Sequence, residues 1–530
     1  MQQKIPLKLL PHEAADDDAI KNWIAKTTGK KLSAVTGFHI HKKSIDARSK
    51  TIWVNLTVNA FIDEPFHKRE IQQFNFKDVS RADKKVIIIG AGPAGLFAAL
   101  QLIEQNIQPI ILERGKDVRA RRRDLAALNK EGEVNPESNY CFGEGGAGTY
   151  SDGKLYTRSN KRGDIDRILN LFVHFGAEEK ILYEAHPHIG TNKLPHIITA
   201  MRQLITDCGG QFLFNQKATG FVIENGKLKS VTTANGDSFS AGAVILATGH
   251  SARDIFEMLH KQNILIEAKP FALGVRVEHP QRLIDSVQYH CNARSEFLPP
   301  APYSLVQQEN GRGVFSFCMC PGGIIAPAAT SPGELVVNGW SPSKRNNAFA
   351  NSGMVVSVDI KDAIDELKKY AMLNTQYSIF NPLLMMHFQQ MVEQKCFAAG
   401  GGKFVAPAQR MVDFSTKKYS ASLPGCSYQP GLQSSQLNEV LPGFVYDCLA
   451  KGFQAFGKKM KGYFTNDAVV VATESRTSSP VRIPRDNETL AHPQIKNLYP
   501  CGEGAGYAGG IVSAAMDGER VAKQIARVIK

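Results

Sequence analysis

Three glycines behind a short apolar run could hold a phosphate group. Val86 to Ile89 are β-branched, and Gly90, Gly92 and Gly95 follow with the spacing Gly-x-Gly-x-x-Gly. In such a motif the first glycine allows a tight turn, the second lets backbone approach a pyrophosphate, and the third lets a helix pack on a strand. That helix would begin at Pro93 and Ala94, and its first free N–H groups, one of which Pro93 lacks, and its positive dipole end would face the phosphates.

An acidic residue stands where a ribose would need one. Glu113 closes a second apolar run, about twenty residues beyond the glycines, and an acid at that place accepts hydrogen bonds from ribose hydroxyls. Glu113 argues against a 2′-phosphate at this site, although Arg114 beside it leaves a small opening for one. The combined pattern predicts a dinucleotide site on a Rossmann-type strand, turn and helix.

A second glycine-rich stretch, residues 140–154, has aromatic residues at its edges. Glycine density lets backbone come close to something flat or charged. A flexible surface loop is the alternative, but the aromatic residues argue against mere flexibility. We therefore predict a second contact with the same cofactor, made by Gly145, Gly146, Gly148 and Thr149.

The cysteines suggest reduced thiols. The nine cysteines are scattered, with no CxxC pair and no zinc-like spacing, so we expect neither a disulfide framework nor a structural metal. Cys318 and Cys320 would place two thiols on one face of a strand. A redox-active pair is one interpretation, and burial as small apolar side chains is the favoured one.

Composition describes an ordinary globular chain of 530 residues, 43% hydrophobic and 21% charged. No apolar run is long enough to span a bilayer, and residues 1–18 lack the apolar core of a secretory signal, so we expect a cytoplasmic protein without a membrane partner. The net charge of +13 could attract nucleic acid or acidic substrates, but charge alone indicates nonspecific association rather than function.

The elements that would position these residues form an α/β protein in four segments. Residues 1–80 read as a small βαββ module that ends in a charged linker, and residues 84–264 as the first part of a Rossmann-type domain. Residues 265–470 change to strands with Pro/Gly turns, which predicts an inserted α+β substrate domain, and residues 471–530 return to α/β and would close the first domain. Residues 265–470 contain no second Gly-x-Gly-x-x-Gly after a strand, which disfavours a separate nicotinamide domain there.

With these stretches in view, the chain resembles the single-Rossmann FAD-dependent oxidoreductases, which share a glutathione-reductase-like flavin domain. More narrowly, four segments are similar to a family of uncharacterised bacterial FAD-dependent dehydrogenases: residues 145–155, 316–323, 474–482 and 501–511. The resemblance implies FAD as cofactor, with the three glycines at the pyrophosphate and Glu113 at the adenosine ribose. It adds further contacts along the cofactor from Ala218, Thr248, Gly249, Gly502, Glu503, Gly510 and Ile511. Where the larger group has Gly-Asp, this chain has Gly502-Glu503.

For catalysis, the best candidates lie just before the closing strand. Arg476 and Arg482 could bind an anionic substrate or the reduced flavin, and Glu474 could orient one of them or act as a base. The alternative is a structural loop held by internal ion pairs.

The expected activity is that of an FAD-dependent dehydrogenase or reductase, which moves hydride or electrons between flavin and a small organic substrate, with NADH or NADPH as a transient donor. Two rivals use the basic N-terminal module: a flavin-containing protein that binds nucleic acid or a partner, and a flavin-dependent tRNA-modifying enzyme. Lys42, Lys43, Arg48 and Lys50 could meet phosphate there, although a solvated hairpin is the plainer interpretation. The chain lacks an aromatic nucleic-acid signature, so nucleic acid ranks low as a partner.

Overall fold

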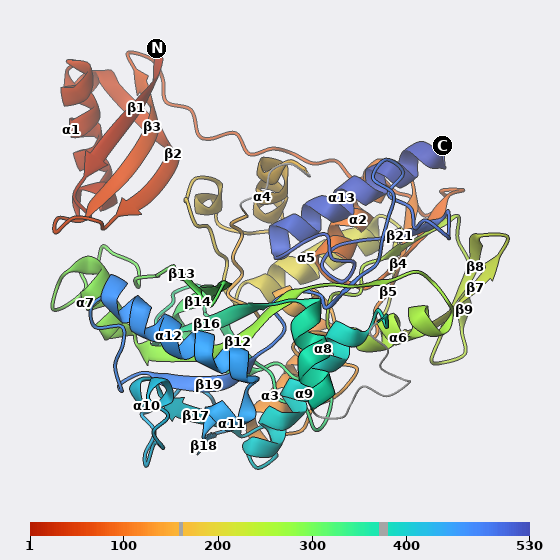
Figure 1. Cartoon of the computed structure of the whole chain (residues 1–530). Helices are drawn as coiled ribbons and strands as arrows, with labels where there is room; N and C mark the ends of the chain where they lie inside the picture. The colour runs from red at the N-terminus through yellow and green to blue at the C-terminus, as the bar shows by residue number, and fades with distance from the viewer. Residues whose placement is uncertain (158–162, 370–379, 530) are drawn as a thin grey trace.

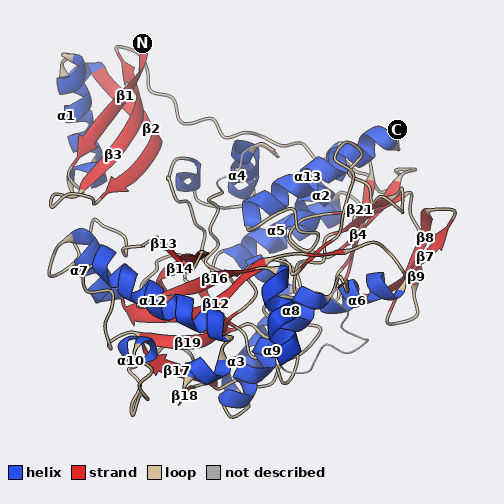
Figure 2. Ribbon diagram, viewed as in Figure 1, coloured by secondary structure: helices blue, strands red, loops and turns tan. Residues whose placement is uncertain are grey.

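The computed structural model describes residues 1–157, 163–369 and 380–529. A small N-terminal module lies at the end of an extended linker, while the rest of the chain builds two large sheets with helices packed around them (Figure 1). Figure 2 shows that the helices gather on the faces of these sheets. Within the described residues, no helix has the length and apolar character needed to cross a bilayer.

The N-terminal module is a three-stranded antiparallel sheet in the order β1-β3-β2, covered by one helix. Its elements are β1 (Gln2–Leu9), α1 (Asp17–Thr28), β2 (Val35–Asp46) and β3 (Trp53–Ile62), with short 3₁₀ turns at Glu13–Ala15 and Leu32–Ala34. Alternate residues of β1 are buried, which is the pattern of a strand with one face on a core. The predicted βαββ module is confirmed.

The basic hairpin of this module is partly occupied by contacts within the chain. The backbone of Lys43 exchanges hydrogen bonds with Tyr183 and Ala185, at 2.8 and 2.9 Å, so the outer strand β2 gains a partner from the flavin-binding part. Arg48 pairs with Asp46 at 2.7 Å. Strand β2 runs to Asp46, so Lys42 and Lys43 lie within it and Arg48 follows its end. Pairing of an edge strand removes a surface that other chains could extend.

The parallel sheet has the order β21-β10-β4-β5-β6. Its strands are β4 (Lys85–Ile89), β5 (Gln108–Leu112), β6 (Gln211–Leu213), β10 (Ala243–Leu246) and β21 (Leu498–Pro500). All neighbours pair in parallel, and the apolar runs of the central strands are buried on both faces. Since β21 comes from the C-terminal end and lies beside β10, the Rossmann-type domain is interrupted by an insertion, as predicted.

The two helices that cover this sheet near its cofactor edge are α2 (Pro93–Glu104) and α13 (Ile511–Val528). They pack so closely that a Cβ at Gly518 would lie 2.1 Å from the carbonyl oxygen of Ala94. Around them lie the other elements of this part: α3 (Val118–Lys130), α4 (Ile165–His174), α5 (Leu194–Asp207), α6 (Arg253–Lys261), β7 (Ala218–Glu224), β8 (Lys227–Thr233), β9 (Ser238–Phe239) and 3₁₀ turns at Gly146–Gly148 and Glu179–Leu182.

The inserted domain is built on a second, largely antiparallel sheet in the order β13-β14-β16-β12-β19-β17-β18, with β15 paired to β14. Its strands are β12 (Phe271–Pro280), β13 (Val306–Glu309), β14 (Arg312–Pro327), β15 (Val337–Trp340), β16 (Phe349–Val358), β17 (Ala406–Arg410), β18 (Leu432–Ser434) and β19 (Val469–Glu474). The helices are α7 (Gln281–Tyr289), α8 (Ile360–Lys369), α9 (Leu384–Ala399), α10 (Met411–Ser415), α11 (Leu437–Val440) and α12 (Gly443–Lys459), and a two-stranded ribbon joins β11 (Glu267–Ala268) to β20 (Val481–Arg482). Helix α8 is described as far as Lys369, and residues 370–379 lie outside the described residues.

A buried histidine of this domain should make stability depend on pH. The ring of His279 in β12 is fully buried, with Nε2 2.8 Å from the carbonyl oxygen of Tyr463, and burial lowers its pKa to about 4. The unfolded chain, with an ordinary histidine pKa near 6.5, therefore binds more protons below pH 6.5. The contribution of the neutral ring to the free energy of unfolding is fully present above pH 6.5. It decreases as the pH falls toward 4, and at pH 5 about 2 kcal/mol of it is lost.

We expect His279→Gln to flatten the pH dependence of the melting temperature between pH 7 and 5. Gln can still donate to the carbonyl of Tyr463 but binds no proton in this range. Thermal unfolding at pH 5, 6 and 7 measures the change. If the melting temperatures of wild type and variant fell in parallel from pH 7 to 5, the prediction would be wrong, and His279 would not be the source of the pH dependence.

Candidate cofactor and active site

A cavity of about 410 Å³ opens at the carboxyl ends of the parallel strands, where α/β sheets commonly bind ligands. Its walls come from both sheets. From the parallel sheet come the turns after β4, β5, β10 and β21, and from the inserted domain come Phe317, Cys318, Asn338, Arg476 and Thr477.

The turn after β4 forms a cradle with no room for side chains. Gly90 has φ +106°, and a Cβ there would lie 2.5 Å from the carbonyl oxygen of Ala247. A Cβ at Gly95 would lie 2.0 Å from the carbonyl oxygen of Gly90, so this glycine serves helix packing and lies outside the cavity lining. Gly92 caps α2 without a side-chain hydrogen bond and lines the cavity with Pro93 and Ala94. The free N-terminus of α2 therefore faces the cavity and suits a phosphate.

Glu113 lines the cavity and also accepts hydrogen bonds from the protein's own backbone. Its carboxylate accepts hydrogen bonds from the backbone N–H groups of Ala91 (2.9 Å), Gly115 (2.9 Å) and Gly143 (3.0 Å). It is only 4% exposed. The predicted ribose contact would be an additional one, since the same carboxylate already joins the turn after β4 to the glycine-rich loop.

We expect Glu113→Gln to weaken both FAD binding and the fold. The amide retains the size of the acid but presents N–H donors to backbone N–H groups, and loss of charged hydrogen bonds costs about 1.5–3 kcal/mol each. The dissociation constant of FAD should rise at least tenfold, by flavin fluorescence titration, and the melting temperature should fall by several degrees. Glu137→Gln is the matched control, since Glu137 lies nearby but makes half-exposed ion pairs. Equal affinities of E113Q and E137Q for FAD would contradict this role.

A buried arginine shapes the glycine-rich loop. Arg121 in α3 is fully buried and donates to the carbonyl oxygens of Asn139 (2.7 Å), Tyr140 (2.8 Å) and Glu144 (2.8 Å). Arg121 lies outside the cavity lining, so its charge holds the loop. The helical spacing of the sequence indicates that Arg121 is buried, because it falls on the buried stripe of α3 that consists of Val118, Arg121, Leu125 and Leu128.

The predicted residues of the glycine-rich loop divide into two groups. Gly146 and Gly148 line the cavity, and a Cβ at Gly146 would lie 3.1 Å from the Cα of Gly92, so the two glycine turns meet face to face. Gly145 and Thr149 lie behind the lining. Thr149 donates to the carbonyl oxygen of Glu144 at 2.9 Å, and a Cβ at Gly145 would lie 2.1 Å from the Thr149 hydroxyl.

Another stretch of the wall offers polar atoms without partners. Ala218, Thr248 and Gly249 all line the cavity. The Thr248 hydroxyl and the side-chain oxygen of Gln216, which also lines the cavity, are buried and have no hydrogen-bond partner within the described chain. Buried polar atoms normally find partners, so these two fit a polar ligand such as the adenosine half of FAD. Arg114 lines the cavity too, but its guanidinium pairs with Glu137 (2.7 Å) and Asp254 (2.9 Å).

The closing segment brings Gly502, Glu503, Gly510 and Ile511 to the same cavity. The Glu503 carboxylate accepts hydrogen bonds from the N–H of Gly510 and from His250 Nδ1 at 3.1 Å. Although burial opposes it, the hydrogen bond from His250 keeps the pKa of Glu503 below its ordinary value. The N-terminus of α13 therefore reaches the cavity with one of its N–H groups already bound to the protein.

The three catalytic candidates do not come together. Arg476 lines the cavity, but its guanidinium is held by Glu393 (3.0 Å), Glu334 (3.3 Å) and Thr330 (2.8 Å). These contacts agree with the alternative of a loop held by internal ion pairs.

Glu474 and Arg482 lie outside the cavity lining. Glu474 is buried and pairs with the fully buried Arg276 at 2.6 Å. Burial raises its pKa to about 7 despite the charge of Arg276. Arg482 is exposed and stacks on the ring of Tyr507, 5.1 Å from its centre. The structure thus offers no contact of either side chain with a ligand in this cavity.

Comparison with known proteins agrees with this architecture. A family model described as a pyridine nucleotide-disulphide oxidoreductase matches residues 84–258, and one described as an FAD-dependent protein, C-terminal domain-like, matches residues 270–477. A domain of unknown function matches residues 1–61. An uncharacterized protein of Clostridium beijerinckii is 40% identical over 534 residues, which cover 96% of each chain.

Several solved structures show a looser likeness. A tetracycline destructase is 11% identical (84% of this chain, 82% of that one, TM-score 0.32), and a flavin-dependent brominase is also 11% identical (84% and 80%, TM-score 0.36). A 2,6-dihydroxypyridine-3-hydroxylase from Arthrobacter nicotinovorans is 10% identical (84% and 83%, TM-score 0.35). At these scores the overall arrangements differ widely. The chain is 40% identical to the clostridial protein over nearly its whole length, and its two large domains match an oxidoreductase model and an FAD-dependent model. The chain therefore belongs to a family of FAD-dependent oxidoreductases, and FAD is its cofactor.

Proposed function

We propose that this protein is a dehydrogenase or reductase that transfers a hydride or electrons between FAD and a small organic substrate. One observation carries the proposal: a single cavity is lined by the glycine turns of the parallel sheet and by side chains of the inserted domain. FAD supplies the redox chemistry, while the protein orients it and excludes competing reactions.

The two faces of the cavity suit different tasks. The turn at Gly92 and the facing Gly146 would hold the phosphates, because backbone N–H groups and absent side chains favour them. The N-terminus of α13 at Ile511 would favour negative charge on the reduced flavin, by about 0.3–1 kcal/mol at an exposed helix end. Phe317 and Asn338 would then be left to contact the substrate from the inserted domain.

A spectrum and an anaerobic titration test this proposal. Purified full-length protein should show flavin absorbance at about one FAD per chain, and NADH or NADPH should be added separately without oxygen. Bleaching by either nucleotide would identify the donor and support a reductase. Bleaching by an organic substrate alone would support a dehydrogenase. A colourless protein that refuses FAD on reconstitution would end the proposal.

A further inference from the structure

Cys318 lies where β14 departs from regular pairing. Phe317 pairs with Gly353 and Cys320 with Asn351, so two residues of β14 stand opposite the single Ser352. Such a bulge re-aims side chains and is frequent beside active sites. Cys318 itself has φ +45°, a conformation that residues other than glycine adopt rarely and mostly for a structural or functional reason. As a result, Cys318 lines the cavity while Cys320 is fully buried behind it.

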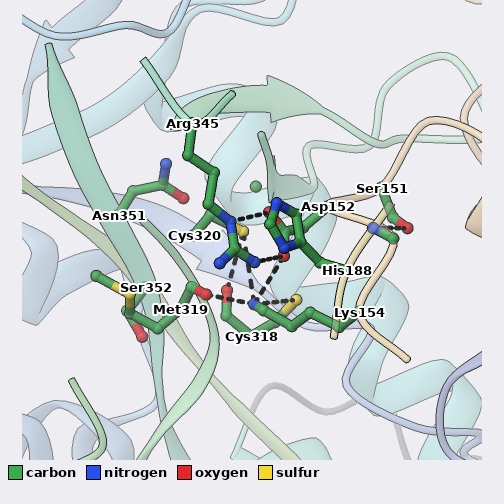
Figure 3. Close-up of polar contacts among 12 residues, drawn as sticks. Ser151, Asp152, Lys154, His188, Cys318, Met319, Cys320, Arg345, Asn351 and Ser352 are labelled. Atoms are coloured by element: carbon green, nitrogen blue, oxygen red, sulfur yellow. Dashed lines mark hydrogen bonds and ion pairs between the residues drawn. The ribbon is translucent and has the colours of Figure 1, made fainter. Parts of the chain in front are cut away.

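Two cations reach this pair of thiols, and one of them, Lys154, is labelled in Figure 3. The ammonium group of Lys154 lies 3.7 Å from the sulfur of Cys318 and 3.9 Å from that of Cys320, and it also donates to the carbonyl oxygen of Met319. From the other side, the guanidinium of Arg276 donates to the carbonyl oxygen of Cys318 at 2.5 Å and lies 3.9 Å from the sulfur of Cys320. Lys154 lines the cavity together with Cys318.

The charges around the thiols leave a place for one more anion. Arg276 has its own carboxylate in Glu474 (2.6 Å), and Arg345 has its own in Asp152 (2.6 Å). Among the described residues, the carboxylate paired with Lys154 is that of Asp152, at 3.8 Å, and Asp152 already pairs more closely with Arg345. Buried charges are costly unless they are paired. A thiolate on Cys318 would give the ammonium group a partner of its own.

His188 beside this cluster adds no charge at neutral pH. Burial and the charge of Arg345 lower the pKa of His188 to about 4, so its ring is neutral. A hydrogen bond from Cys320 and the charges of Lys154 and Arg276 hold the pKa of the Cys318 thiol well below its ordinary value. The same hydrogen bond, together with burial, holds that of Cys320 well above it. Cys318, which lines the cavity, is therefore the better placed of the two to carry the thiolate, while Cys320 is fully buried behind it.

We propose that Cys318 and Cys320 are a redox-active dithiol at the cavity wall, in which Cys318 is the nucleophile and a small disulfide is the oxidant. The Cys318 thiolate attacks one sulfur of R–S–S–R, forms a Cys318–S–R bond and releases RS⁻. Cys320 then attacks the sulfur of Cys318, which forms the Cys318–Cys320 disulfide, breaks the S–S bond to the R–S group and releases a second RS⁻. The second RS⁻ takes the proton of Cys320, so the dithiol loses two electrons and the substrate disulfide gains them.

Alkylation measures the reactivity of Cys318 without any need for turnover or bound FAD, so its failure is separate from failure of the proposed function. Full-length protein is treated with iodoacetamide between pH 5 and 9, and labelling of each cysteine is followed by peptide mass spectrometry. At pH 7, Cys318 should react at least tenfold faster than Cys501, which lines the same cavity but whose thiol pKa is raised by burial. Equal rates would overturn the proposal.

Variants of Lys154 test the cause of this reactivity. Lys154→Met should slow labelling of Cys318 about tenfold at pH 7 and move its pH midpoint upward, whereas Lys154→Arg keeps a cation and should restore most of the rate. Melting temperatures of both variants control for the fold. An unchanged pH midpoint in a folded K154M would contradict a thiolate held by Lys154.

The second step is tested with hydroxyethyl disulfide as the probe. Wild-type protein should form the Cys318–Cys320 disulfide, seen as the loss of two hydrogens from the peptide that contains both. Cys320→Ser should instead retain the probe as a mixed disulfide on Cys318, and Cys318→Ser should prevent both products. If C320S accumulates no adduct, or if C318S still captures the probe at Cys320, the assignment of roles is wrong.

Discussion

Replacement of Gly92 by aspartate is expected to abolish FAD binding while the chain remains folded. Gly92 has φ −77°, which any residue adopts, and the nearest atom to a Cβ there would be the Cα of Gly146 at 3.9 Å. Aspartate is also a favourable residue at a helix N-cap, so α2 should not lose stability. Its carboxylate would occupy the helix N-terminus where the pyrophosphate is expected, and would repel it.

The dissociation constant of FAD should rise at least 100-fold, which corresponds to about 2.8 kcal/mol. Flavin fluorescence titration of the apoprotein measures it, and circular dichroism verifies the fold. Gly92→Ala is the control, because its methyl group makes only ordinary contact and should change the affinity less than tenfold. Unimpaired FAD binding by a folded G92D would mean that the pyrophosphate lies elsewhere.

The largest loss of stability is expected from Glu393→Gln. Glu393 is fully buried in α9, where its carboxylate binds Arg253 (2.8 Å), Arg476 (3.0 Å) and the hydroxyl of Ser475 (2.6 Å). Burial opposes ionisation, yet the two arginines hold the pKa of Glu393 at about 2. Removal of this charge leaves the buried guanidinium of Arg476 and the mostly buried one of Arg253 with Glu334 as their remaining carboxylate, at a cost of about 3–5 kcal/mol.

Thermal and urea unfolding of E393Q measure the loss. The control is Glu224→Gln, which removes an ion pair whose two side chains are more than half exposed and should cost less than about 1 kcal/mol. Because Arg476 lines the cavity, E393Q should also weaken FAD binding. A melting temperature equal to that of E224Q would show that the two arginines find other partners or lose their burial.

Local signals explain why the cofactor side was predictable. The turn at Gly90 and the packing of Gly95 depend on the absence of a Cβ, and only glycine meets that need, so residue type reports geometry directly. The buried strand before them carries its own apolar pattern. The closing strand β21 was predicted in the same way, since a short apolar run, a glycine turn and an amphipathic helix recur there.

The charged networks were not predictable, because each joins residues that are far apart in the chain. Arg276 on β12 meets Glu474 on β19 only because the two strands are neighbours in the second sheet. Lys154 reaches Cys318 through a bulge that no local pattern announces. Residue types near 474 indicated ion pairs or catalysis equally well, and only the register of the strands shows where each side chain lies.

The interrupted sheet also sets the order in which the molecule can be completed. Strand β21 and helix α13 leave the ribosome about 400 residues after β4, which takes about 20–80 s at 5–20 residues per second. Throughout that time the nascent chain displays the apolar side of α2 that α13 will cover, and it lacks one wall of the flavin pocket. Cofactor loading is therefore a late event of biogenesis, and a truncated product of translation would remain a colourless client of chaperones.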